Sequence, residues 1–241
     1  MAQLSNGERI TKAESTDVGV GFEVELGYLR ICVISLAIVS VCVVLTALHP
    51  WGGWKSPTII TTIAFIPVLI YMGMRRDAVA EKFMLACLIS GFLELAADWY
   101  IIVVKPTTMY MGGGPFIWES PLYMPFSWTI VPFTVGMISR WVDKRWGLLT
   151  AMIIAGLLGL LMVPGWEHLA KYAGFWYYYN TPMIGNTPYY IMFGECIIFA
   201  SLPFALRFIN PSRWITSIGV GAGMGLWIFI AFWMGNQLFH F

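Results

Sequence analysis

The sequence predicts an all-α integral membrane protein, a bundle of seven transmembrane helices capped by two long external loops. Hydrophobic residues make up 59% of the 241 residues and charged residues only 11%. The mean hydropathy is +0.73, and this composition lies outside the range of soluble globular domains. Apolar stretches of about 20 residues, the length with which a helix crosses a bilayer core, recur along the chain. We therefore expect a multi-pass integral membrane protein.

Seven apolar stretches are long enough to span the membrane. They cover residues 28–49, 56–74, 83–104, 124–142, 146–163, 189–208 and 214–239. The second stretch is the least regular, because Pro57 and Pro67 interrupt it. The polar residues 1–27 are expected to form an N-terminal tail, and residues 28–241 the transmembrane domain.

The basic residues predict the orientation. Of the 14 Lys and Arg residues, only Lys55, Lys105 and Lys171 fall on one side of the predicted bundle. The positive-inside rule therefore places the N-terminus in the cytoplasm and the C-terminus outside. A net charge of +1 without a clustered basic patch argues against a nucleic-acid partner.

Two predicted external connections are long, residues 105–123 and 164–188. Both are rich in Pro, Gly and aromatic residues, a composition that favours turns and packing over a solvated chain. We expect them to fold into a cap over the outer mouth of the bundle. The aromatic residues that support this interpretation are Trp118, Tyr123, Trp166, Phe175, Trp176, Tyr177, Tyr178 and Tyr179.

The third apolar stretch carries two carboxylates, Glu94 and Asp98. Ionisable side chains inside a membrane span are costly and often mark a functional site. Residues four apart lie on the same face of a helix, so the two carboxyls are expected to be neighbours. Glu94 is too deep to reach the interface, since snorkelling favours Lys and Arg. A structural hydrogen bond to a neighbouring helix is the alternative.

More acids are expected on the same outer side. Glu195 lies in the outer half of the sixth stretch, and Glu119 lies in the first long loop. Glu167, in the second loop, is interpreted as a residue in contact with water. The candidate catalytic residues are therefore Glu94, Asp98, Glu195 and Glu119.

Carboxyls held close together in a low-dielectric site are expected to share a proton at neutral pH, which provides a general acid for an apolar substrate. Aromatic faces could stabilise a cation that develops on that substrate. The candidate substrate-binding residues are Trp99, Tyr100, Trp118, Tyr123, Trp128 and Trp176.

A metal site is a second chemical interpretation. His49, His168 and His240 all fall at external helix ends, where they could join the acids around iron, copper or zinc. No two histidines have the three- or four-residue spacing typical of metal-binding helices. The four cysteines lie in apolar stretches without CxxC spacing, which predicts packing rather than ligation. We therefore expect no cofactor, with the histidine site as the alternative.

One stretch resembles a known family. It has an acidic residue, Glu94, in an early apolar helix, with Gly91 and Phe92 before it and Trp99 and Pro106 after it. This pattern is similar to that of the small integral-membrane terpene cyclases of meroterpenoid and indole-diterpene pathways. The resemblance implies a seven-helix fold and an acid that protonates a prenyl chain. In that family a second catalytic acid lies late in the chain. Here Asn236 and Gln237 stand in the last span, and Glu195 is the nearest candidate.

The sequence thus predicts a membrane enzyme, a cyclase or isomerase, that uses buried carboxylates on a hydrophobic, isoprenoid substrate. A lipid- or pigment-binding subunit of a larger complex and a metal-dependent membrane oxygenase are the alternatives. The expected partners are membrane lipid and a hydrophobic small molecule. The last span also predicts a contact with either a second copy of the chain or a partner subunit. The reason is that two overlaid GxxxG spacings in this span let another helix approach closely; they are formed by Gly219, Gly221, Gly223 and Gly225.

Overall fold

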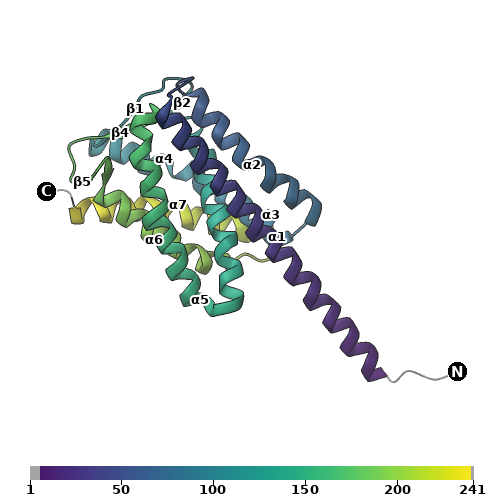
Figure 1. Cartoon of the computed structure of the whole chain (residues 1–241). Coiled ribbons are helices and arrows are strands. Elements are labelled where there is room, and N and C mark those ends of the chain that lie inside the picture. The colour runs from purple at the N-terminus through teal and green to yellow at the C-terminus, as the bar shows by residue number, and fades with distance from the viewer. Residues whose placement is uncertain (1–5, 240–241) are drawn as a thin grey trace.

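The computed structural model describes the backbone of residues 6–239 and the side chains of residues 23–239. Six helices in this part of the chain are long and apolar enough to cross a membrane. They form one bundle, shown in Figure 1. The long helical elements are α1 (Asn6–Leu48), α2 (Lys55–Arg75), α3 (Ala78–Leu93), α5 (Met124–Ala173), α6 (Tyr189–Leu206) and α7 (Trp214–Phe239). Much of the segment expected to be an N-terminal tail is therefore helical in its backbone.

Large apolar side chains cover the outside of the bundle. Ile70, Leu149, Leu161 and Leu226 are each at least 60% exposed. A helix that is apolar on its outer face as well as its inner face is typical of a membrane span, because lipid rather than water surrounds it. The composition of the chain and the exterior of the fold therefore agree.

The fourth and fifth predicted stretches share one element, which is why six helices are found where seven were predicted. α5 has 50 residues and would be about 75 Å long if straight, against a bilayer core of about 30 Å. At Gly147 the backbone leaves helical geometry, with φ 81° and ψ 168°. Figure 1 shows the chain reversing direction within α5.

The third predicted stretch is not one regular helix. α3 ends at Leu93, α4 (Leu95–Trp99) follows, and a π-helical turn η1 covers Tyr100–Val104. At the junction the Ala97 N–H donates to the carbonyl of Glu94 at 2.7 Å, which tightens the turn. π-helical turns within helices occur frequently at functional sites. The acidic segment thus lies between two departures from α-helical geometry.

The two long loops pair with each other. β1 (Thr108–Tyr110) lies antiparallel to β4 (Trp176–Tyr178), with Met109 opposite Tyr177. Each loop also forms a small hairpin, β2 (Phe116–Ile117) with β3 (Ser120–Pro121), and β5 (Met183–Ile184) with β6 (Thr187–Pro188). Figure 1 shows these strands together at one end of the bundle.

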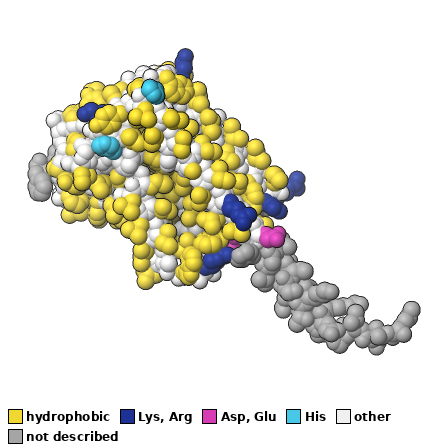
Figure 2. Space-filling model, in the orientation of Figure 1, with side chains coloured by type: hydrophobic (Ala, Val, Ile, Leu, Met, Phe, Trp, Pro, Cys, Tyr) yellow, Lys and Arg dark blue, Asp and Glu magenta, His cyan; other side chains and the backbone are white. Residues whose placement is uncertain are grey.

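Ionic contacts lie at the other end. Arg140 bridges Asp77 at 2.7 Å and Glu25 at 3.6 Å, and Lys144 also pairs with Glu25. Figure 2 shows Lys and Arg side chains gathered near the point where the N-terminal helix leaves the bundle. The basic residues of this end are therefore partly neutralised by carboxylates.

The glycines of α7 divide into two rows. A Cβ added at Gly221 would lie 2.6 Å from the carbonyl oxygen of Ala86, and one at Gly225 would lie 2.4 Å from Cβ of Leu93. A Cβ at Gly219 or Gly223 would have no neighbour within 4 Å. Only the Gly221 and Gly225 row is therefore used for packing against α3.

This division predicts opposite effects of two matched substitutions. Gly221→Ala should lower the free energy of unfolding, because overpacking costs about 1–3 kcal/mol and exceeds the gain in helix propensity of about 1 kcal/mol. Gly223→Ala should leave stability unchanged or raise it. Thermal unfolding in detergent micelles measures both. Equal shifts in Tm for the two variants would contradict the α3–α7 packing.

Candidate functional site

Glu94 and Asp98 form a buried carboxyl pair. Their side chains are 1% and 4% exposed. The Asp98 carboxyl lies within electrostatic range of Glu94. Two negative charges this close would repel strongly in a low-dielectric environment, and the sharing of one proton would relieve that repulsion.

Two hydroxyl groups from the first long loop donate hydrogen bonds to Asp98. Tyr110 Oη and Ser120 Oγ each donate to Oδ2 of Asp98 at 2.6 Å. Burial, together with the nearby Asp98 and Glu94 carboxyls, raises the pKa of the Tyr110 phenol well above its usual value. Tyr110 therefore stays protonated and remains a donor. The sequence analysis missed both residues, because neither lies in a recognisable motif.

Glu195, from α6, is the third buried acid. It is 3% exposed and lies within electrostatic range of Glu94. Oε2 of Glu195 and Oε2 of Glu94 are both buried, and neither has a hydrogen-bond partner among the described residues. A buried polar atom without a partner costs about 1–3 kcal/mol, so such atoms in a native fold call for an explanation.

Asn236 of α7 presents the same feature. It is fully buried, and neither its Nδ2 nor its Oδ1 has a partner among the described residues. One turn earlier on α7, Phe232 packs against Trp128 and covers Gly194, the residue before Glu195.

Glu167 joins the acids from the last part of α5, so its interpretation as a water-exposed loop residue is wrong. α5 continues to Ala173, which places Glu167 on a helix, where it is half-buried. Trp176 Nε1 donates to its Oε2 at 2.7 Å, and Tyr178 Oη donates to the same atom at 2.6 Å. Its carboxyl lies within electrostatic range of Asp98 and Glu195.

The acids border a small cavity with aromatic walls. Its volume is about 100 Å³, and Glu167 and Glu195 both line it. Ligand pockets usually measure about 300–1,000 Å³, so this space suits only the reacting end of a larger molecule. The aromatic residues on its walls are Trp128, Trp166, Trp176 and Phe199.

The other predicted residues divide between the site and the surface. Trp128 and Trp176 line this cavity, and Tyr123 lines two neighbouring ones. Tyr100 is buried and accepts a hydrogen bond from Gln237 Nε2 at 3.4 Å. Trp99 and Trp118 are 42% and 70% exposed, so they do not contribute aromatic faces to the buried site.

The prediction that Glu119 joins the acidic site is wrong. Its side chain is exposed, whereas Ser120, the next residue, is fully buried against Asp98. Glu119 lies in the turn between β2 and β3, where its side chain is exposed, whereas Ser120 is the first residue of β3 and is buried. A shift of one residue therefore places the serine, not the acid, in the site.

The two described histidines, His49 and His168, do not form a metal site with the acids. His49 is exposed at the end of α1, and Nδ1 of His168 accepts the Asn186 N–H at 3.1 Å. His240 lies outside the described residues. Within residues 23–239, no group of three or more His, Cys, Asp or Glu side chains has a geometry that could hold a metal ion.

Comparison with known proteins identifies a family but not a function. Residues 95–239 match a domain of unknown function, DUF6989, and the chain belongs to this family. The matched range includes Asp98, Tyr110, Ser120, Glu167 and Glu195, and it begins directly after Glu94. No curated protein matches the chain. No solved structure matches it either.

The hydroxyl donors of Asp98 allow a direct test of the geometry. Tyr110→Phe and Ser120→Ala should each lower the free energy of unfolding by about 1–3 kcal/mol, because each leaves a buried carboxyl oxygen with one donor fewer. Tyr177→Phe is the matched control, since its hydroxyl contacts only the Met109 sulfur at an exposed position. Thermal unfolding in detergent compares the three variants.

The same test can assign the effect to Asp98. In an Asp98→Asn background the cost of Tyr110→Phe should shrink, because the charged acceptor has gone. An unchanged cost in that background would show that Tyr110 acts through other contacts.

Proposed function

We propose that this protein is a membrane enzyme that performs acid–base chemistry on a hydrophobic substrate, an isoprenoid in particular, as a cyclase or isomerase. The observation that carries the proposal is the group of four inward-facing carboxyls, Glu94, Asp98, Glu167 and Glu195, around an aromatic-walled cavity. None of the ion pairs formed by described residues includes any of these four. Acids buried without cations are suited to hold and transfer protons.

The four acids suggest different roles. Glu195 and Glu167 line the cavity and could touch a substrate. Glu94 and Asp98 lie behind them and share a proton, so they act as a proton reserve for Glu195. Glu167 already accepts two hydrogen bonds on one oxygen, an arrangement that stabilises a carboxylate. We therefore assign proton donation to Glu195 and proton acceptance to Glu167.

The reaction that fits these roles balances without a co-reactant. The proton of Glu195 adds to one carbon of an alkene, and a cation forms on the other carbon. In a cyclisation a second double bond of the same molecule supplies the electron pair for the new carbon–carbon bond. Loss of a proton from a neighbouring carbon to Glu167 then restores a double bond. Indole and phenol faces around the cavity stabilise the cation through their quadrupoles.

We also propose how the helices cross the membrane. Counting the two arms of α5 separately gives seven crossings. The basic end, with Arg140 and Lys144, then faces the cytoplasm under the positive-inside rule. The paired loops lie on the outer side as a cap over the acids. A cap that excludes water would protect a cationic intermediate from hydration.

A lipid- or pigment-binding subunit is the second candidate. The observation that favours it is an apolar groove of about 540 Å³ between α2, α3 and α5, which is large enough for a lipid chain. A subunit of this kind would bind the molecule without converting it, and the acids would then have a structural role.

Analysis of the purified protein separates these candidates. Mass spectrometry of organic extracts should detect an unsaturated hydrophobic molecule or its isomer, and incubation with the extracted compound should convert it. Elemental analysis of the same sample tests the oxygenase alternative. A stoichiometric molecule that is never converted would support the subunit reading, and stoichiometric iron or copper would support the oxygenase.

Substitution of the acids tests the mechanism once a converted compound is known. Glu195→Gln and Glu94→Gln should lower kcat by about 10²–10⁴-fold, the usual contribution of general acid–base catalysis. Asp98→Asn should change the pH profile of kcat, because it removes one member of the proton-sharing pair. Initial rates in detergent or nanodiscs measure these effects.

Glu119→Gln is the matched control, since Glu119 is exposed and should leave kcat unchanged. Retained helical circular dichroism would show that the inactive variants are folded. Full activity in Glu195→Gln would remove Glu195 from the mechanism.

A further inference from the structure

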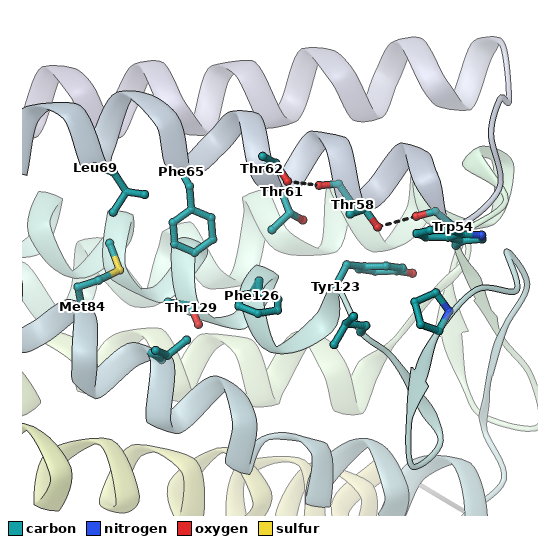
Figure 3. Close-up of a pocket in the computed structure, with 13 residues that line it drawn as sticks. Trp54, Thr58, Thr61, Thr62, Phe65, Leu69, Met84, Tyr123, Phe126 and Thr129 are labelled. Atoms are coloured by element: carbon teal, nitrogen blue, oxygen red, sulfur yellow. Dashed lines mark hydrogen bonds between the residues drawn. The ribbon is translucent and has the colours of Figure 1, made fainter.

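An apolar groove lies on the outside of the helical bundle. It has a volume of about 540 Å³ and runs between α2, α3 and the beginning of α5. Figure 3 shows Trp54 and Tyr123 at one end of the groove and Leu69 and Met84 at the other. The fifteen residues of α2 between these ends rise about 22 Å, long enough to accommodate an extended hydrocarbon chain.

Three threonine hydroxyls of the groove already donate hydrogen bonds within the protein. Thr58 and Thr62 donate to carbonyls one turn earlier, those of Trp54 and Thr58, as the dashed lines in Figure 3 mark. Thr129 donates to the carbonyl of Pro125 in the same way. The hydroxyl protons of these threonines are therefore unavailable to a ligand. The groove offers mainly methyl, methylene and aromatic surface, which suits a hydrocarbon and not a polar group.

The groove adjoins the acidic cavity through a third space, and neighbouring spaces share wall residues. A second space of about 90 Å³ shares Thr61 and Tyr123 with the groove. It also shares Ser127 and Trp176 with the cavity that contains Glu167 and Glu195. Three adjoining spaces thus lead from the lipid-facing side to the acids.

A hydrogen bond between two helices lies on this path. The Thr61 and Ser127 hydroxyls are 2.8 Å apart and join α2 to α5. Thr61 lines the groove and the middle space, and Ser127 lines the middle space and the acidic cavity. The pair and the Tyr123 ring therefore stand between the lipid side and the acids.

From this adjacency we infer that the groove is the membrane-side access route and the tail-binding subsite of the substrate. The substrate is a long apolar chain, an isoprenoid or similar polyene. Its tail lies between α2 and α3, and its reacting end passes Thr61 and Tyr123 to reach Glu195. The inference rests on the proposed function for the reacting end, whereas binding of the tail depends only on the groove. A small inner cavity and a large outer groove together match such a molecule better than either does alone.

Photo-labelling in lipid nanodiscs tests the groove without turnover. The probe is a farnesol analogue that carries a diazirine, and mass spectrometry maps the labelled peptides. Labels should concentrate near Met84 and Phe126, in excess of those near Leu161, which is 71% exposed on the far arm of α5. Equal labelling of both regions would overturn the inference, since it would show ordinary contact with a lipid-like probe.

A matched pair of substitutions makes the test specific. Thr62→Trp fills the groove and should lower labelling near Met84 by about tenfold, the scale on which a poor fit in an apolar pocket reduces binding. Thr150→Trp is the control, because Thr150 also donates to the carbonyl one turn earlier on a helix outside the groove. Unchanged labelling in Thr62→Trp would overturn the inference. Should that variant fail to fold, Leu88→Trp fills the groove from α3 and gives the same readout.

The acid variants distinguish this inference from the proposed function. Glu195→Gln should keep groove labelling while it loses turnover. Specific labelling together with full turnover in Glu195→Gln would leave the subsite standing and remove the proposed chemistry. Acid-dependent turnover with no preference for the groove would overturn the subsite and leave the chemistry standing.

Discussion

The hydrogen bonds from Tyr110 and Ser120 to Asp98 are the interaction on which the arrangement of the site depends. They tie a loop outside the membrane spans to a carboxyl inside one. Tyr110 lies on β1, and β1 pairs with β4 of the other long loop, which supplies Trp176 and Tyr178 to Glu167. One set of hydrogen bonds therefore fixes the paired loops, the carboxyl pair and the cavity wall relative to one another.

The site keeps polar groups that remain unpaired within the described residues. One oxygen of Glu94, one of Glu195 and the whole amide of Asn236 have no partner, although all three side chains are buried. A fold evolved only for stability would replace such groups by apolar ones, which is often neutral or stabilising. Their retention beside an aromatic cavity is the main argument for chemistry at this end of the bundle. The charged groups at the opposite end, in contrast, form ion pairs with one another.

Much of the candidate site could be predicted from the sequence, but the residues that the loops contribute could not. Acids inside apolar stretches stand out by composition alone, so Glu94, Asp98 and Glu195 were found. Glu119 was chosen because it is acidic and near the right end, yet the hairpin turns Ser120 inward instead. Glu167 was set aside as a loop residue, because the end of α5 extends past the apolar stretch that predicted it. In each case a one-residue or one-turn difference decided which side chain faces the acids.

The sequence by itself determined the class, a helical protein with several membrane-spanning stretches, because burial in lipid imposes a length and an apolarity that can be counted residue by residue. It also determined that carboxyls lie within apolar stretches. The tertiary structure alone decided which groups meet the carboxyls, since Tyr110, Ser120, Tyr178 and Trp176 are ordinary loop residues until β1 and β4 pair. It likewise decided that an apolar groove adjoins the acidic cavity, because that arrangement depends on the packing of α2 against α5 through Thr61 and Ser127.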